Sequence, residues 1–583
     1  MILPVGIAAG GERWCGMTVY DERPWLRSYD AGIAPDIDVP EGTYLDMLER
    51  GLTFKPDRAA FYFLGRKFTY RDLDTLSMRF ASFLREKGCV PGDVVGINLP
   101  NTPQYLIAMA GTYRAGCAVS GVSPLLTPKE MAHQLNDLKA KVLVTLDAIY
   151  ENRVQKIRDD VPALKCIVAT NIADFMPPLK CVLAKLLKKV PMGKVDPIPG
   201  KVVVDFKRVV SEARPSLPKA SIGPGDTCLI QYTGGTTGTP KGAVLTHRNM
   251  VANISQCIQW LHLEQASDVY CSGFPFFHAA GLFFGMVSMA TSNTQCLIPD
   301  PRNTKHMCQE MSQHPPHIML HVPSLYQMLV NDPAFSKIDF SHCEVCISGA
   351  APFSSDGIAA LEAVVGKGKL LELYGMTEAS PIITMNPMKG KKKIGSVGIP
   401  LPGTRLKLVD VETGTQQVPL GEVGEVIVRG PQVMKGYHDK PEDTAGTLRE
   451  FENEKWLYTG DVARMDEDGY FFIADRTKDM LIVGGFKVFS REVEEVLSQH
   501  KAVEFCAIIG ISNPERPDSQ IVKAVIQLSK EAAGRGHEDV KKEIMEYCRE
   551  NLSAYKVPKI IEITDAIPLT AVGKVDKKAL RVK

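Results

Sequence analysis

The sequence predicts a large α/β domain followed by a small α+β domain, and three stretches of the chain indicate this architecture. Residues 56–180 alternate helix-like and strand-like runs, which is typical of a largely parallel sheet covered by helices. Residues 404–475 change to short strands joined by tight turns, which indicates a small and mostly β subdomain. After Lys478 the chain mixes strands and helices for about 100 residues, the size of an independent domain.

Individual elements follow from the spacing of apolar residues. Between residues 70 and 87 these residues recur at helical spacing, at Leu73, Leu76, Phe80 and Leu84, and predict a helix. Strands are predicted at 94–99, 141–146, 405–409, 424–429, 470–474, 480–483, 503–509 and 521–527, and further helices at 492–499 and 540–551.

Length and composition indicate a globular chain with more than one domain. A chain of 583 residues is too long for one hydrophobic core. The 68 basic and 67 acidic residues leave a net charge of +1, which provides no electrostatic footprint for nucleic acid. The 14 cysteines are scattered, which indicates reduced thiols and a cytoplasmic setting. Cys343 and Cys346 form a single CxxC in an apolar run, and we interpret them as strand cysteines rather than metal ligands.

Two stretches bear on targeting and membranes. No run of about 18 uncharged apolar residues occurs, so a spanning helix is not expected. Residues 1–16 lack the basic start of a secretory signal and are interpreted as a flexible tail or a mis-assigned extension. Residues 176–200 contain a run that is apolar on one face and carries Lys180, Lys185 and Lys188 on the other. That run predicts either a surface helix with a solvated basic face or a helix that rests on an anionic membrane surface.

The strongest functional signal is a loop rich in glycine and threonine after the predicted strand at 227–231. Its glycines permit positive φ, which turns backbone N–H groups inward, and its threonine hydroxyls add donors. A lysine at the far end adds a positive charge, so the loop is suited to bind phosphate. The lysine follows proline, so this is not a Walker A loop. The residues concerned are Thr233, Gly234, Gly235, Thr236, Thr237, Gly238 and Lys241.

The segment 232–249, YTGGTTGTPKGAVLTHRN, resembles the core motif of the adenylate-forming superfamily. This superfamily contains acyl-CoA synthetases, the adenylation domains of peptide synthetases and beetle luciferases. The resemblance covers residues 43–583 in the family's order and spacing. It implies a large domain of two α/β subdomains and a small distorted β-barrel, with a small mobile C-terminal domain. The implied divisions are a lead-in at 1–42, an AMP-binding domain at 43–475 and a small domain at 476–583, with the hinge at Lys478.

Two further segments resemble the parts of the family that surround the acyl group and the adenine. Phe276-Phe277-His278 resembles the aromatic segment of the acyl tunnel, which implies that His278 lies beside the reacting carboxyl or thioester. The turn Gly349-Ala350-Ala351 resembles the one beneath the adenine, where small residues let the backbone approach the nucleotide.

The run Tyr374-Gly375-Met376-Thr377-Glu378 resembles the next family motif, and each polar side chain has a chemical use. The Tyr374 ring is suited to stack on adenine, and the Thr377 hydroxyl to reach the α-phosphate. Glu378 is the implied ligand of Mg²⁺, a hard cation that prefers oxygen.

The remaining motifs supply the implied ribose-binding residues and the functional residues of the small domain. Asp461 and Arg476 are the implied partners of the ribose hydroxyls and of the ribose or phosphate. Lys574 matches the family's catalytic lysine. A strand with Gly484, Gly485 and Lys487 is implied to face the pantetheine tunnel during thioester formation. Two positions depart from the pattern: Ser490 stands where many relatives have proline, and Ser519-Gln520 where many have Gly-Glu.

The resemblance implies two half-reactions with ATP, Mg²⁺ and coenzyme A. A carboxylic acid first attacks the α-phosphorus of ATP, while Lys574 stabilises the developing charge. The small domain then turns about Lys478 so that the thiol of coenzyme A reaches the acyl carbonyl. The expected partners are these small molecules and no nucleic acid, for a monomer or a homodimer.

Several features resemble bacterial long-chain fatty acyl-CoA synthetases. These features are QYTGGTTG, the run PDPRN at 299–303, the insertion near 176–200 and the opening ERPW at 22–25. Phenylalanines and glycines around His278 are consistent with an apolar tunnel. Some relatives place a gating tryptophan near position 282, where this chain has Leu282, so medium-chain, branched and aryl acids stay open.

Three other functions share part of this pattern of motifs. An acyl-AMP ligase that loads a separate carrier protein stays open, whereas a luciferase-like enzyme is disfavoured because the chain has no Ser-Lys-Leu tail. A non-catalytic nucleotide-binding scaffold is disfavoured because it has no need for the full set of Lys241, Glu378, Asp461, Arg476 and Lys574.

Overall fold

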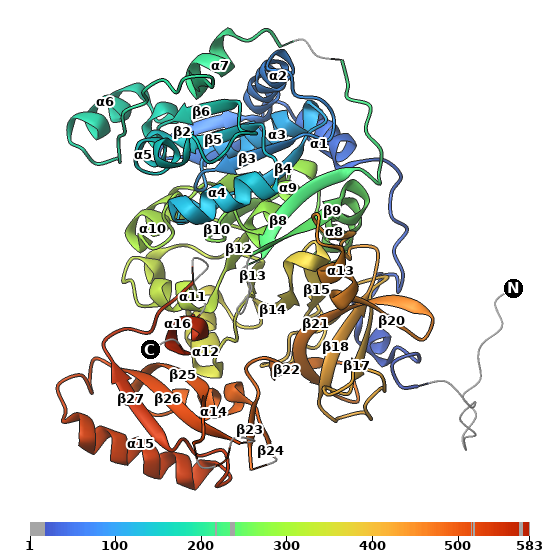
Figure 1. Cartoon of the computed structure of the whole chain (residues 1–583), viewed down its shortest axis with the longest axis vertical. Helices are drawn as coiled ribbons and strands as arrows, with labels where there is room; N and C mark the ends of the chain where they lie inside the picture. The colour runs from blue at the N-terminus through green and yellow to red at the C-terminus, as the bar shows by residue number, and fades with distance from the viewer. Residues whose placement is uncertain are drawn as a thin grey trace, which may run out of the picture.

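The computed structural model describes residues 18–215, 218–233, 240–484, 486–514, 516, 519–570 and 575–581. These residues form a large domain of mixed sheets and helices and a smaller α+β domain, which lies at the bottom of Figure 1. The fold class predicted from the sequence is therefore confirmed. Residues 1–16 lie outside the described residues.

The first sheet of the large domain has eight strands in the order β19-β9-β8-β4-β3-β5-β6-β7. Its central strands pair in parallel, and every residue of β3, β5 and β6 is buried. Continuous apolar strands are expected where helices cover both faces of a parallel sheet. The strands are β3 (Val94–Asn98), β4 (Ala118–Gly121), β5 (Val142–Leu146), β6 (Cys166–Thr170), β7 (Val202–Asp205), β8 (Thr227–Thr233), β9 (Lys241–Thr246) and β19 (Gly436–Tyr437).

The second sheet has nine strands in the order β16-β15-β14-β13-β12-β10-β11-β1-β2. Helix α9 (Ala279–Ala290) is almost wholly buried and packs on α1 (Tyr44–Phe54) and α8 (His247–Trp260), so it belongs to the core of the large domain. The strands are β1 (Ala59–Phe63), β2 (Arg66–Thr69), β10 (Val269–Ser272), β11 (Thr294–Cys296), β12 (Ile318–His321), β13 (Val345–Ser348), β14 (Leu370–Gly375), β15 (Ile382–Met385) and β16 (Ile399–Pro400).

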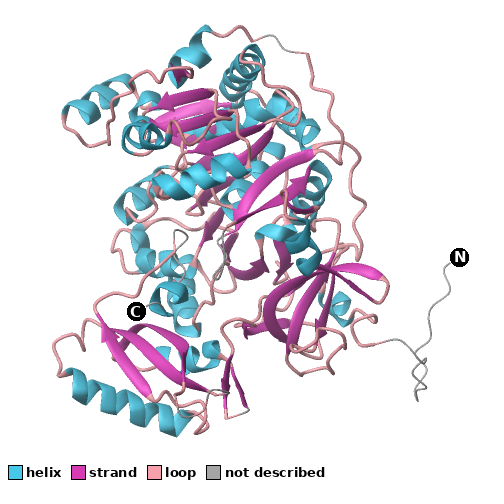
Figure 2. Ribbon diagram, in the orientation of Figure 1, coloured by secondary structure: helices cyan, strands magenta, loops and turns pink. Residues whose placement is uncertain are grey.

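The predicted β subdomain forms an antiparallel sheet of five strands, drawn at the lower right of Figure 2. The strand path is β17-β18-β21-β20, and β22 pairs with β21. The strands are β17 (Arg405–Val409), β18 (Gly424–Arg429), β20 (Leu448–Phe451), β21 (Glu454–Met465) and β22 (Phe471–Arg476).

The small domain has a hydrophobic core of its own, which includes Val493, Ile508 and Ile544. A three-stranded sheet, two longer helices and a two-stranded hairpin surround this core. Its elements are β23 (Leu481–Val483), β24 (Phe486–Val488), α14 (Ser490–Ser498), β25 (Val503–Ser512), β26 (Gln520–Leu528), α15 (His537–Asn551), β27 (Ile560–Thr564) and α16 (Lys577–Arg581).

Several helices of the large domain begin with side-chain caps. Thr69 caps α2 (Tyr70–Glu86), and Thr127 caps α4 (Pro128–Asp137), each in a capping box. The expected basic run forms helix α6 (Pro178–Leu186), which projects at the upper left of Figure 1. Among the described residues, no helix is both long and apolar enough to cross a membrane.

Candidate active site

The predicted phosphate loop joins two neighbouring antiparallel strands. Thr233 at the end of β8 lies opposite Lys241 at the start of β9, and the Thr233 hydroxyl is 3.4 Å from the Lys241 carbonyl oxygen. The ladder therefore holds the two ends of the loop together. The residues between them that were assigned to phosphate, Gly234, Gly235, Thr236, Thr237 and Gly238, lie outside the described residues.

Lys241 and Glu378 are linked through one tyrosine. The Lys241 ammonium forms an ion pair with Asp443 and lies 5.3 Å from the centre of the Tyr437 ring. The Tyr437 hydroxyl donates a 2.8 Å hydrogen bond to Glu378 Oε1. The structure thus brings together the lysine of the loop and the carboxylate assigned to the metal. The sequence reasoning missed Tyr437 and Asp443, because both lie outside any recognised motif.

Glu378 follows β14 in the short helix η5 (Thr377–Ala379), and both Thr377 and Glu378 are buried. Burial raises the pKa of Glu378, while the Tyr437 hydrogen bond acts in the opposite direction. Among the described residues, no group of three or more His, Cys, Asp or Glu side chains could hold a metal by itself. Mg²⁺ is commonly bound by one or two carboxylates together with substrate phosphates, so a single Glu378 carboxylate fits that ion.

Three residues from two sheets form a hydrogen-bond network at the predicted ribose position. Asp461 on β21 lies opposite Arg476 on β22, and Arg476 Nε donates to Asp461 Oδ1 at 3.1 Å. The Tyr374 hydroxyl, from β14, donates to Asp461 Oδ2 at 2.7 Å. Each carboxylate oxygen retains a second lone pair, so Asp461 keeps the capacity to accept ribose hydroxyls.

The pKa values of both donors in this network are raised. The negative charge of Asp461 is the main cause that raises the pKa of Arg476. Burial, followed by the same carboxylate, raises the pKa of Tyr374 well above its usual value. Tyr374 and Arg476 therefore both act as donors, and they orient the carboxylate.

The turn assigned to adenine follows β13, and its backbone is tightly constrained. A Cβ on Gly349 would lie 2.7 Å from Leu373 Cδ1, so the Leu373 side chain would have to shift to admit a larger residue there. Ala350 has φ of 71°, a left-handed conformation that is rare for residues other than glycine, and half-buried Ala351 follows it. A Cβ on Gly375 would lie 2.0 Å from the Pro381 carbonyl oxygen. Close backbone packing thus requires glycine at position 375.

The segment assigned to the acyl group is attached to the strand that carries the phosphate loop. His278 is half-buried at the N-terminus of α9. Gln231, two residues before Thr233 on β8, donates from Nε2 to the Phe277 carbonyl oxygen at 2.9 Å. Leu282, Phe283 and the rest of α9 are largely buried and apolar. The structure therefore places His278 between the loop strand and an apolar helix.

The strand assigned to coenzyme A lies apart from these groups. Lys487 on β24 forms a 3.1 Å ion pair with Glu412, in the turn between β17 and β18. The Gly484 N–H donates to Ser519 Oγ at 2.8 Å, and the Ile482 N–H donates to Gln520 Oε1 at 3.1 Å. Ser519 and Gln520, which depart from the family pattern, thus support the hairpin of β23 and β24. Gly485 and Lys574 lie outside the described residues.

A polar network connects the last strand of the large domain with the small domain. Lys478 lies in the link between β22 and β23. Close to that link, Ser490 donates from both its N–H and its hydroxyl to Asp475, with the hydroxyl 3.1 Å from Oδ1. Lys577 lies 2.6 Å from Ser490 Oγ and 2.8 Å from Glu494 Oε1. Proline has no N–H, so proline at position 490 would not form the same tether.

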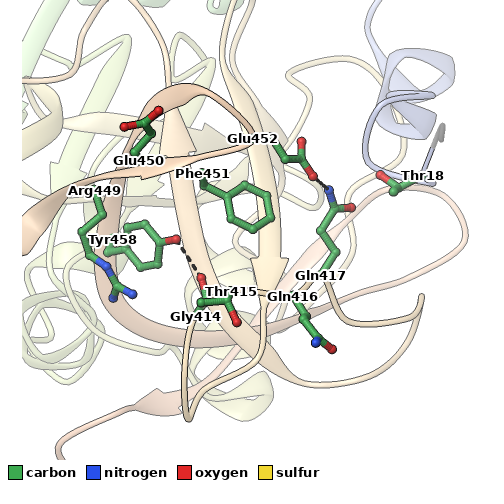
Figure 3. A pocket seen from close by; sticks show the side chains of 10 residues that line it. All are labelled: Thr18, Gly414, Thr415, Gln416, Gln417, Arg449, Glu450, Phe451, Glu452 and Tyr458. Carbon is green, nitrogen blue, oxygen red and sulfur yellow. Dashed lines mark hydrogen bonds between the residues drawn. The ribbon is translucent and has the colours of Figure 1, made fainter.

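An open pocket of about 540 Å³ lies on the five-stranded sheet, but it contains none of the predicted site residues. Figure 3 shows that some of its polar groups pair with one another. The Tyr458 hydroxyl donates to the Gly414 carbonyl oxygen at 2.8 Å, and Gln417 Nε2 to Glu452 Oε1 at 2.5 Å. The geometry therefore gives no reason to place the reactants there.

Lys241 at the end of the glycine-threonine sequence, the buried carboxylate of Glu378 and the Asp461–Arg476 pair are the residue types expected in enzymes that bind ATP to activate a carboxylic acid. The model of the AMP-binding enzyme family matches residues 48–438, and that of the AMP-binding enzyme C-terminal domain matches residues 492–574. The chain belongs to the AMP-binding enzymes, which confirms the resemblance drawn from the motifs.

Curated relatives match the chain over nearly its whole length. It is 36% identical to a long-chain-fatty-acid–CoA ligase of Bacillus subtilis, over 96% of this chain and 98% of the relative. A feruloyl-CoA synthase of Amycolatopsis is 33% identical over 89% of this chain and 94% of its own.

Solved structures agree with the fold. The anthranilate CoA ligase AuaEII in complex with anthranoyl-AMP has a TM-score of 0.80 at 28% identity, covering 94% of this chain and 98% of its own. ATP-bound MatB from Rhodopseudomonas palustris has a TM-score of 0.77 at 27% identity, covering 92% and 98%. Apo MatB from the same organism has a TM-score of 0.69 at 26% identity, covering 93% and 99%.

Proposed function

We propose that this chain is an ATP-dependent acid–CoA ligase that converts a fatty acid, ATP and coenzyme A to acyl-CoA, AMP and diphosphate. The observation that carries the proposal is the pair of connected networks, Lys241–Tyr437–Glu378 and Tyr374–Asp461–Arg476. One network includes Tyr374 of β14 and the other includes Glu378 in η5, directly after β14, so the proposed phosphate, metal and ribose functions adjoin one short segment. A curated relative that acts on long-chain fatty acids, at 36% identity, supports the choice of acid.

The first half-reaction forms an acyl-adenylate. A carboxylate oxygen attacks the α-phosphorus, the bond from that phosphorus to the bridging oxygen breaks, and diphosphate leaves. Lys241 and the loop after Thr233 would hold the β- and γ-phosphates, and Lys574 would bridge the carboxylate and the α-phosphate. Glu378 would hold Mg²⁺, which when bound neutralises phosphate charge. Asp461 and Arg476 would fix the ribose, and the 349–351 turn and Tyr374 the adenine.

The second half-reaction transfers the acyl group to the thiol of coenzyme A. The thiol sulfur attacks the acyl carbon, the bond to the phosphate oxygen breaks, AMP leaves and the thiol proton passes to solvent or a base. We propose that the small domain, residues 476–583, turns about Lys478 relative to residues 43–475 and brings Gly484, Gly485 and Lys487 to the cleft. The position of Lys487 beside Glu412, away from Asp461, supports such a turn between the two steps. The higher TM-score with ATP-bound MatB than with apo MatB supports the adenylation arrangement in this structure.

The alternatives concern the acid and the acceptor. The feruloyl-CoA synthase and the anthranilate ligase keep an aryl acid as the second candidate. The buried apolar surface of α9 behind His278 supports an aliphatic chain. We further propose a cytoplasmic enzyme that is a monomer or a homodimer and binds no nucleic acid.

The test is diphosphate release with fatty acids of increasing length and with aryl acids, each with and without coenzyme A. The proposal expects release and thioester formation with fatty acids, and weaker turnover with aryl acids. Diphosphate release without any thioester would instead indicate transfer to a carrier protein. No diphosphate release with any acid would refute ligase activity.

A further inference from the structure

Helix α6 and the turn after it expose more apolar surface than any comparable stretch among the described residues. Apolar side chains that are normally scattered singly gather here, and the helix has no buried residue. Leu186 is 74% exposed and Leu179 is 73% exposed. We name the set the α6 ridge: Leu179, Val182, Leu183, Leu186 and Leu187.

The amphipathic pattern of α6 is reversed with respect to the protein. The side of the helix that contacts the large domain carries the small residues Cys181 and Ala184. It also carries Lys185, which pairs with Asp174 at 2.9 Å. The leucines point the other way, so the fold leaves the apolar face without a partner among the described residues. A surface helix normally turns that face inward.

Positive charge surrounds the ridge. Residues 176–200 contain five lysines and one acidic residue, Asp196, whereas the whole chain has a net charge of only +1. Lys188 and Lys189 are exposed in the turn after the helix, and neither forms an ion pair within the described part of the chain. Asp196 already pairs with Lys194 at 3.0 Å. The exposed face of the ridge is therefore apolar, and exposed lysines lie next to it in the chain.

We propose that the α6 ridge seats the enzyme on the surface of a bilayer that contains anionic phospholipids. Leucines enter the boundary between headgroups and acyl chains, while lysines contact the phosphates. A second copy of the chain is the less favourable occupant, because a symmetric contact would bring the lysines of both copies together. The ridge lies at the opposite end of the molecule from α15 in Figure 1, so seating leaves the small domain clear of the membrane.

The test is sedimentation with vesicles of phosphatidylcholine alone, and of phosphatidylcholine and phosphatidylglycerol in equal parts. The proposal expects binding to the mixed vesicles that weakens as salt is added. Leu183→Gln with Leu186→Gln should weaken it about 10-fold or more, through lost apolar contact. Lys188→Gln with Lys189→Gln should weaken it about 10- to 30-fold, by about 1 kcal/mol per lysine.

Matched controls remove the same side chains elsewhere. Phe54→Gln with Ile394→Gln removes two exposed apolar side chains, and Lys337→Gln with Lys367→Gln removes two exposed lysines. Both should bind as the parent does. Equal binding of ridge and control variants, absence of parent binding, or a change only in self-association would each overturn the proposal. Because vesicle binding needs no ligase activity, failure of the proposed reaction would be seen separately, in diphosphate release.

Discussion

The nucleotide cleft and the junction between the domains are built in opposite ways. In the cleft, Asp461 and Glu378 are buried, and each accepts a hydrogen bond from a tyrosine of the same large domain. At the junction, polar contacts cross from one domain to the other. Glu412 is 77% exposed on its side chain and pairs with Lys487, and Ser490 holds Asp475. Buried, paired groups fix substrate geometry, whereas a small number of polar contacts can be exchanged when a domain turns.

The largest expected effect is that of replacing Lys574, which belongs to the small domain that we propose turns between the two half-reactions. Lys574→Ala should lower the rate of adenylation by about 100-fold or more, because it removes charge stabilisation in the transition state. Thioester formation from supplied acyl-AMP should keep most of its rate. The rates of both half-reactions are measured, with exposed Lys578→Ala as control.

Lys478→Pro should slow thioester formation more than adenylation, since it stiffens the hinge. Equal losses in both half-reactions would contradict the two-position assignment.

A change in the cleft should affect both half-reactions alike. Asp461→Asn keeps the shape but removes the charge that Arg476 and Tyr374 contact. Loss of charged hydrogen bonds should raise the KM for ATP about 10-fold and weaken AMP binding by a similar factor. The readout is KM for ATP together with AMP binding by calorimetry. Unchanged AMP affinity would remove Asp461 from the ribose site.

Glu372 is a buried carboxyl group on β14, close to the junction between the two domains. Burial raises the pKa of Glu372 to about 7, although the Gly395 N–H and the charge of Arg491 from the small domain each lower it. The unfolded chain releases this proton near its usual value of 4.5, so stability contributed by the protonated group is full below that pH. It is lost as pH rises toward 7, and the loss amounts to about 2 to 3 kcal/mol.

Glu372→Gln should therefore flatten the fall in thermal stability between about pH 5 and about pH 8. Thermal unfolding across that range, compared with exposed Glu467→Gln, measures the effect. An unchanged pH profile in Glu372→Gln would show that another group titrates.

The smallest expected effect is at the tether. Ser490→Pro is compatible with the first position of α14, yet it removes both donors to Asp475. We expect adenylation to slow about 3- to 10-fold, because hydrogen bonds that favour this domain position are lost. Ser490→Ala keeps the N–H donor and should have an intermediate effect. The two half-reactions measured separately decide this, and a larger loss with alanine than with proline would contradict the tether.

Local patterns predicted much of the architecture. The helix expected at 70–87 is observed as Tyr70–Glu86, and the strand expected at 521–527 as Gln520–Leu528. Both have regular apolar periodicity, which depends on neighbouring residues alone. The position of α6 could not be predicted in this way, because an amphipathic run does not reveal which of its faces the rest of the fold covers.

The motif residues alone predict the chemistry of the cleft, since they carry donors, acceptors and charges suited to ATP. The groups that pair with these residues follow from the tertiary fold. Tyr437 reaches Glu378 across 59 positions of chain, and Ser490 reaches back to Asp475. Such contacts arise from the pairing of distant strands and the packing of domains, and no local pattern encodes them. For the same physical reason, the outward face of α6 became visible only once the fold had buried the other side.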